Sequence, residues 1–343
     1  MTVLITGAAG FIGYHIADAL AARGERVIGI DNLNPFYDVR LKEARLKRLE
    51  AHKGFVFRRV DIANREAMEG LAGAHPEIDV IIHLAAQAGV RYSLHNPFAY
   101  VESNVVGHLA VLETARRLPG LRHLVYASSS SVYGANKTMP YRETDRVDTP
   151  LSLYAATKRA DELIGHAYAH LFGLPQTGLR FFTVYGPWGR PDMAYYSFAR
   201  AIVAGQPITL YDNGLLRRDL TYIDDIVAGV LACVDHPPTG NPPVQLLNIG
   251  NHQAEEIRTL VALLEKELGQ KAVLRYAPRP PTDVEETFAS VDAIGALTGF
   301  VPRTRLSEGI HRFAAWFLAW EKSLAHSGPS AAQLATRDDP IGS

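Results

Sequence analysis

A tyrosine and a lysine stand four residues apart in the stretch "SLYAATK", residues 152 to 158. On a helix Tyr154 and Lys158 would share one face, because residues i and i+4 are neighbours there. A lysine ammonium beside a phenol stabilises the phenolate, so the tyrosine can take a proton from a substrate hydroxyl while hydride leaves for a nicotinamide. Most isolated pairs of this kind have no function, so the surrounding sequence must decide.

Four consecutive serines precede this pair in "YASSSSVYG", where an apolar strand ends. A hydroxyl at that strand end can bond the same substrate oxygen as Tyr154. A strand ending in serines about 25 residues before the tyrosine argues against a chance pair once a dinucleotide loop is also present.

Such a loop is predicted at the N-terminus, in "VLITGAAGFIGYHIADAL". Gly7 allows a tight turn after the strand, Gly10 lets the backbone approach a pyrophosphate, and Gly13 lets the helix pack closely on the strand. The helix N-terminus supplies free N–H groups and the positive end of a dipole. The spacing is G-x-x-G-x-x-G rather than the commoner G-x-G-x-x-G.

Acidic residues end the next two strands. Asp31 lies 18 residues after Gly13, where a carboxylate accepts hydrogen bonds from an adenosine ribose and repels a 2′-phosphate, which favours NAD over NADP. The alternative is a turn-capping aspartate. Asp61, in "RRVDI", is expected to reach the adenine. The small residues of "HLAAQAG", 83–89, suit backbone that runs beside a cofactor.

These residues need a sheet to position them. Short strands, apolar throughout, alternate with helix-length segments, which predicts an α/β fold with a doubly wound parallel (Rossmann) sheet covered on both faces. The predicted strands are 3–6, 27–30, 55–59, 80–83, 123–127 and 177–182. The predicted helices are 13–23, 41–52, 65–72, 97–117 and 151–172.

The pattern changes after residue 183, where "VYGPWGRPDM" is rich in Gly and Pro. Helices at 195–204, 221–236 and 255–268 and strands at 208–211 and 246–249 predict a smaller α/β substrate-binding region. We therefore predict an NAD-binding domain over 1–183, a substrate-binding region over 184–324 that is interleaved with it, and a disordered polar tail over 325–343.

The composition excludes several classes of protein. The chain of 343 residues has 35 basic and 36 acidic residues, so no basic surplus favours nucleic acid or an anionic membrane. It has no run of 18 apolar residues and no pattern of a signal peptide. The histidines are scattered and no metal site is predicted. A single cysteine, Cys233, fits a reducing compartment, so we expect a cytoplasmic protein.

Together the glycine loop, the serine strand and the Tyr-x-x-x-Lys pair resemble the extended short-chain dehydrogenase/reductase family. More narrowly, the chain resembles the nucleotide-sugar epimerases, and among them the UDP-glucuronate 4-epimerases. The narrower match is carried by "DNLNPFYDVRLKEARL" (31–46), "AAQAGVRYSLHNP" (85–97), "YASSSSVYGANKTMP" (126–140), "LRFFTVYGPWGRPDMA" (179–194) and "RRDLTYIDDIV" (217–227). The resemblance covers most of residues 1–230 and continues weakly to about 320.

The resemblance implies the roles of the catalytic and cofactor residues. Tyr154 is the base, Lys158 its partner, and Ser129 and Ser131 the helper hydroxyls. NAD is the implied cofactor. The residues expected to bind it are Gly7, Gly10, Phe11, Ile12, Gly13, Asp31, Asn32, Asp61, Ile62, Leu84, Ala85, Ala86, Gln87, Asn104, Tyr154 and Lys158.

The resemblance also implies a UDP-sugar substrate. Arg190 is the candidate for a sugar carboxylate, which a guanidinium grips bidentately. Thr183 stands where UDP-galactose epimerases carry asparagine, a departure shared with the uronate enzymes. Arg218 resembles the arginine that binds the diphosphate; Arg279, Arg91 and Ser129 complete the substrate set. Family members read Pro-Gly-Asp where this chain has Pro281, Thr282 and Asp283.

The implied reaction inverts C4 of UDP-glucuronate to UDP-galacturonate through a 4-keto sugar, with NAD regenerated in each cycle. Alternatives in the same family are a UDP-glucuronate decarboxylase and a UDP-glucose/galactose 4-epimerase. The decarboxylases place an acid in the serine strand, where this chain has Ser130 and Ser131. A dehydrogenase that releases NADH and a non-enzymatic NAD-sensing module are further alternatives; the latter is expected to lose Tyr154 or Lys158.

Family members pair helices like 97–117 and 151–172 into a homodimer, although an internal core would also explain their apolar faces.

Overall fold

A computed structural model describes residues 1–280 and 284–326. Its centre is a seven-stranded sheet in which every neighbouring pair of strands is parallel, in the order β10-β6-β5-β4-β1-β2-β3. The strands are β1 (Thr2–Thr6), β2 (Arg26–Asp31), β3 (Phe55–Arg59), β4 (Val80–His83), β5 (His123–Ser129), β6 (Gln176–Phe181) and β10 (Val244–Ile249). This confirms the predicted doubly wound α/β fold.

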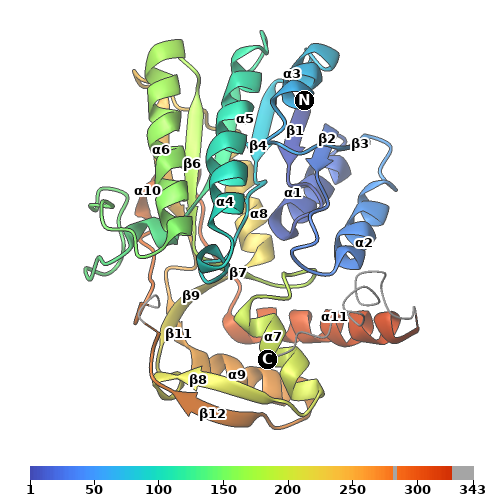
Figure 1. The fold of residues 1–343 in the computed structure, drawn as a ribbon, viewed down its shortest axis with the longest axis vertical. Coiled ribbons are helices and arrows are strands. Elements are labelled where there is room, and N and C mark those ends of the chain that lie inside the picture. Colours follow the sequence, from blue (N-terminus) through green and yellow to red (C-terminus); the bar gives the residue numbers. More distant parts are fainter. Residues whose placement is uncertain (281–283, 327–343) are drawn as a thin grey trace.

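Helices cover both faces of this sheet (Figure 1). One layer consists of α3 (Arg65–Ala74), α4 (Pro97–Tyr100), α5 (Gly107–Arg116) and α6 (Leu153–Phe172); the other contains α1 (Phe11–Ala22), α2 (Val39–Leu49), α8 (Ile223–Val234) and α10 (Asp292–Thr298). Alternate residues of β1 enter different cores: Val3 and Ile5 join the layer of α1, and Leu4 joins that of α3 and α5. Burial on both faces explains why the inner strands β1 and β4 are almost wholly apolar.

A smaller region lies beyond the carboxyl ends of the large sheet (Figure 1). Its sheets are β11-β9-β7 and β12-β8. Its elements are β7 (Thr183–Tyr185), α7 (Ala194–Val203), β8 (Pro207–Tyr211), β9 (Arg217–Tyr222), β11 (Ala254–Glu256), α9 (Ile257–Leu268), β12 (Val273–Ala277) and α11 (Leu306–His326). The chain returns to the large sheet at β10, which pairs with β6. The predicted tail, 325–343, lies outside the described residues except for Ala325 and His326, which end α11.

Several predicted bounds shift by a few residues, β12, α10 and α11 were not predicted, and three helices differ in a way that has a physical reason. The helix predicted over 97–117 is α4 and α5 separated by a π-helical turn, η2 (Val101–Val106), which brings Asn104 into the interior. The helices predicted from 221 and 255 begin at Ile223 and Ile257, because the residues before them form β9 and β11. Pairing with a distant strand therefore sets the residue at which each helix begins. The local hydrophobic periodicity of the sequence does not reveal such pairing.

The described part of the chain contains no helix that is both long and apolar enough to cross a membrane. In the same residues no three His, Cys, Asp or Glu side chains gather in a way that could hold a metal ion.

Candidate active site

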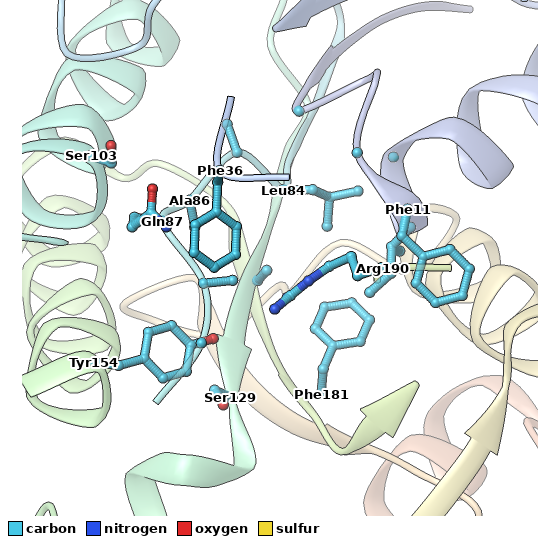
Figure 2. A pocket seen from close by; sticks show the side chains of 18 of the residues that line it. Phe11, Phe36, Leu84, Ala86, Gln87, Ser103, Ser129, Tyr154, Phe181 and Arg190 are labelled. Carbon is cyan, nitrogen blue, oxygen red and sulfur yellow. The ribbon is translucent and has the colours of Figure 1, made fainter. Parts of the chain in front are cut away.

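A cavity of about 400 Å³ opens at the carboxyl ends of the large sheet. The strand order reverses at β1, between β2 and β4, and ligands of open α/β sheets bind at such a point. Many of the predicted site residues line this one cavity: Gly7, Gly10, Phe11, Ile12, Gly13, Asp31, Asn32, Asp61, Ile62, Leu84, Ala85, Ala86, Gln87, Ser129, Ser131, Tyr154, Lys158, Thr183 and Arg190. Figure 2 shows Tyr154 and Ser129 at one end and Phe11 at the other.

The glycine loop, residues 7–13, forms the floor at the start of α1. Gly7 has φ of +73°, and a Cβ on it would lie 2.8 Å from the backbone nitrogen of Ala85. A Cβ on Gly13 would lie 2.1 Å from the carbonyl oxygen of Gly7. No side chain caps α1, whose N-cap is Gly10. Close backbone packing and uncapped N–H groups facing a cavity are what a dinucleotide pyrophosphate requires, so these residues fit NAD.

The carboxylate of Asp31 ends β2 at the cavity wall. Its Oδ1 accepts hydrogen bonds from Leu33 N at 2.8 Å and from Lys42 Nζ at 3.3 Å. The structure gives no bond to its Oδ2 among the described residues, so this oxygen can accept from a ribose hydroxyl. Asp61 lies beside it and accepts from the side-chain amide of Asn32 at 2.9 Å.

Tyr154 lies in the first turn of α6, which Ser152 caps by accepting from Ala155 N at 3.1 Å. Its ring packs edge-to-face on Tyr100 at 6.0 Å between centroids. Lys158, one turn later, is buried and donates to Asp161 Oδ2 at 2.8 Å. Burial lowers the pKa of Lys158, but the negative charge of Asp161 outweighs it and the pKa is raised. Lys158 therefore stays an ammonium beside the tyrosine.

The serines at the end of β5 have different partners. Ser129 Oγ donates to Ser131 Oγ at 3.1 Å, and both line the cavity. Ser128 Oγ donates instead to the buried carboxylate of Glu162 at 2.6 Å. Glu162 is held by Arg180 at 2.8 Å. Ser129 and Ser131 thus form a hydroxyl pair in the cavity wall, while Ser128 anchors the strand to α6.

Arg190 reaches the same cavity from the loop after β7. In Figure 2 its guanidinium lies between Leu84 and Phe181 and is directed toward the end that holds Tyr154. Burial lowers the pKa of Arg190, but the carboxylate of Asp192 outweighs it and the pKa is raised. A permanent cation thus faces the tyrosine and the serines.

Four predicted residues do not line the cavity. Asn104 is buried behind its wall, where its side chain accepts from Gln87 N at 2.8 Å and donates to Gln87 O at 3.1 Å. Its role in the described structure is to brace a cavity residue.

The other three residues, Arg91, Arg218 and Arg279, form an arginine cluster at the edge of the smaller region. Arg91 lies over the ring of Tyr211 at 5.2 Å. Arg279 Nε lies 3.6 Å from Asp212, and its Nη1 lies 3.4 Å from Glu285. Arg218 donates to the carbonyl of Glu285 at 3.1 Å. Pro281, Thr282 and Asp283 lie outside the described residues.

Three residues that sequence reasoning missed support the site: Lys42, Arg45 and Asp161. Lys42 and Arg45 lie on the buried face of α2 together with Leu41 and Leu46. Cations on the apolar face of a predicted amphipathic helix were a usable signal, because buried charges need partners. Asp161 gave no such signal, since its burial follows only from how α6 packs.

Residues 3–250 of the chain match the model of the NAD dependent epimerase/dehydratase family. UDP-glucuronate 4-epimerase 1 of Arabidopsis thaliana is 44% identical over 337 residues, which span 93% of this chain and 77% of that protein.

Two solved structures are similar throughout. UDP-glucuronic acid 4-epimerase from Bacillus cereus, in complex with UDP-glucuronic acid and NAD, has a TM-score of 0.86 and 34% identity over 93% of this chain and 100% of that one. UDP-glucose 4-epimerase from Thermotoga maritima, with UDP-glucose, has a TM-score of 0.84 and 28% identity over 94% and 100%.

Proposed function

We propose that this chain, which belongs to the NAD dependent epimerase/dehydratase family, inverts C4 of UDP-glucuronate to give UDP-galacturonate. The observation that carries the proposal is the placement of Arg190 in the same cavity as Tyr154, Ser129 and Ser131. A guanidinium there offers a sugar carboxylate a bidentate partner, and a neutral sugar has no group that needs one.

The cofactor is NAD. Gly7, Gly10 and Gly13 would hold its pyrophosphate against the start of α1, and Asp31 would hold its adenosine ribose. When bound, NAD supplies reversible acceptance of a hydride from the sugar.

Tyr154 is the residue that transfers the proton of the C4 hydroxyl. As the phenolate, which the buried ammonium of Lys158 stabilises, Tyr154 takes the proton of the C4 hydroxyl. The neutral phenol then returns a proton to the C4 oxygen when the hydride comes back. Ser129 and Ser131 donate to the same oxygen from the end of β5. The arginine cluster would hold the diphosphate while the sugar turns over.

The carboxylate makes the 4-keto intermediate fragile. A ketone at C4 makes C6 the carboxylate of a β-keto acid, which loses CO2 when the breaking bond aligns with the ketone π system. Arg190 and Thr183 would hold the carboxylate out of that alignment. Decarboxylation, the alternative left open by the sequence, would need an acidic side chain near the sugar, and the cavity does not supply one among the described residues. Of the described residues the only acids that line it are Asp31 and Asp61, both at the predicted cofactor end.

The test is turnover without added cofactor. The purified protein is incubated with UDP-glucuronate alone, and the products are separated and weighed by mass spectrometry. We expect a product of unchanged mass that matches UDP-galacturonate. A product lighter by CO2 would assign the chain to the decarboxylases, and turnover of UDP-glucose alone would assign it to the neutral-sugar epimerases and remove the role of Arg190.

We also propose a homodimer formed through the outer face of α4, α5 and α6. These helices lie side by side (Figure 1). Their exposed side chains include Phe98, Leu109 and Leu163, with relative exposures of 84%, 40% and 56%. Such a stripe of apolar groups is typical of an interface between protein chains. Size-exclusion chromatography with light scattering should give twice the chain mass, and Phe98→Glu should shift it toward the monomer.

The compartment that we propose is the cytoplasm. Cys233 is a free thiol, and burial raises its pKa to about 12, so the one cysteine is neither paired nor reactive.

A further inference from the structure

Asp192 occupies one edge of the Arg190 guanidinium. Its Oδ1 accepts from Nε at 3.0 Å, and its Oδ2 accepts from Nη2. A guanidinium has two edges that can grip a carboxylate, one formed by Nε and Nη2 and one by Nη1 and Nη2. In the described part of the chain no hydrogen bond is made by Nη1. The second edge is therefore the one left for a ligand in the cavity.

The backbone that leads into Arg190 is held as well. Arg45 is fully buried, and its guanidinium donates to Trp188 O, to Gly189 O at 3.2 Å and to Ala9 O at 2.8 Å. On the other side, a Cβ on Gly189 would lie 1.8 Å from the hydroxyl oxygen of Tyr195. Because residues 188 and 189 are fixed in this way, the main freedom left to Arg190 is rotation of its side chain.

We propose that Asp192 is a positioning residue that turns the Nη1–Nη2 edge of Arg190 toward the C6 carboxylate and so limits loss of CO2. This inference rests on the proposed function. Asp192 itself is about one third exposed and need not touch the substrate. Its contribution is to exclude the orientation in which the carboxylate and guanidinium pair through Nε, which would rotate the carboxylate about the C5–C6 bond.

The chemistry links orientation to product. Once C4 is a ketone, decarboxylation breaks the C5–C6 bond, CO2 leaves, and the bonding electron pair forms an enolate on the C4 oxygen that takes up a proton at C5. The rate depends on overlap between the breaking bond and the ketone π system. A guanidinium free to rotate samples more aligned geometries, so the fraction of product lacking CO2 reports the orientation of Arg190.

The first measurement is a crystal structure of Tyr154→Phe with UDP-glucuronate, in which turnover is blocked. We expect both carboxylate oxygens within hydrogen-bond reach of Nη1 and Nη2 while Nε stays on Asp192. A carboxylate that displaces Asp192 from the guanidinium, or that lies away from Arg190, would overturn the proposal.

The second measurement is the product ratio of Asp192→Asn. Asparagine offers one acceptor oxygen and no charge, so it holds the guanidinium poorly. We expect the fraction of product lacking CO2 to rise about tenfold over the unmodified protein, with melting temperature and retained NAD unchanged. The control is Asp148→Asn, which removes a matching pair two residues apart, Arg146 Nε to Asp148 Oδ2 at 2.6 Å, outside the cavity.

The outcomes separate the two claims. If the unmodified protein epimerises UDP-glucuronate and folded Asp192→Asn gives the same product ratio, the role of Asp192 is wrong and the proposed function stands. If the unmodified protein leaves UDP-glucuronate unchanged, both are wrong. Should Asp192→Asn unfold, Asp192→Glu keeps the charge but moves both oxygens by one methylene from where they meet Nε and Nη2, so it must give a measurable shift in the ratio or the proposal fails.

Discussion

Lys158 and Asp161 form an ion pair that the fold buries almost completely. Nζ and Oδ2 lie 2.8 Å apart, and the two side chains are 3% and 0% exposed. Both belong to α6, and the pair lies one turn beyond Tyr154. Asp161, which is itself buried, holds the ammonium of Lys158 in place. Without this partner the buried charge of Lys158 would be strongly unfavourable.

This pair predicts a pH dependence of stability. Burial raises the pKa of Asp161 to about 6, against the opposing effect of Lys158, whereas an unfolded aspartate titrates near about 4. As the pH falls through 6, the folded chain binds a proton that the unfolded chain does not yet bind, so the free energy of unfolding rises at this group. We expect the unmodified protein to gain about 1 kcal/mol relative to Asp161→Asn between pH 7 and pH 5 in urea denaturation. Parallel curves for the two proteins would contradict this.

Tyr154→Phe should reduce kcat by about 10²-fold to 10⁴-fold, because it removes the proton acceptor and leaves the ring packing on Tyr100 intact. Retained NAD, read from absorbance after denaturation, should not change. The matched control is Tyr168→Phe on the same helix, which removes the hydroxyl that bonds Glu113 at 2.7 Å and does not line the cavity. Equal losses in the two variants would argue against a catalytic tyrosine.

Asp31→Asn should shift the cofactor preference toward NADP by about tenfold or more. The change keeps an oxygen for Leu33 N but removes the charge that repels a 2′-phosphate, and it leaves the ammonium of Lys42 without its carboxylate. Calorimetric titration of cofactor-stripped protein with NAD and with NADP measures the ratio. Asp18→Asn, which loses a pair with His52 on the protein surface, should leave the ratio unchanged.

Gly13→Ala should cost both stability and cofactor. The new methyl group would meet the Gly7 carbonyl at 2.1 Å, and because both groups belong to packed backbone, the loop or α1 must shift. We expect a loss of about 2 kcal/mol or more in the free energy of unfolding and a lower NAD content.

The control for this change is Gly70→Ala in α3, where a Cβ meets nothing within 4 Å. That variant should be neutral or gain about 0.5–1 kcal/mol from the higher helix propensity of alanine. Similar behaviour of the two glycines would show that the loop tolerates a side chain and that its close packing is not needed.

The sequence by itself determined the sheet, the glycine loop and the pair Tyr154 and Lys158, because each has a signal within a few residues. Buried parallel strands are short and apolar throughout, a tight turn beside a phosphate needs glycine, and i, i+4 spacing places two side chains on one helix face. Residues 184–193, which contain Arg190, were also readable as a break in the pattern.

Only the tertiary structure decided which of these residues meet and what supports them. It placed Asn104 behind the wall instead of in it, gathered Arg91, Arg218 and Arg279 at another edge, and extended β9 and β11 into the first two residues of the helices expected from 221 and 255. It also joined Arg45 of α2 to the carbonyls before Arg190, over more than 140 residues of sequence. Such contacts depend on how distant elements pack, and no local periodicity or motif encodes which groups they join. The buried cations of α2 could be suspected from the sequence, but the carbonyls that Arg45 binds were known only once the chain was folded.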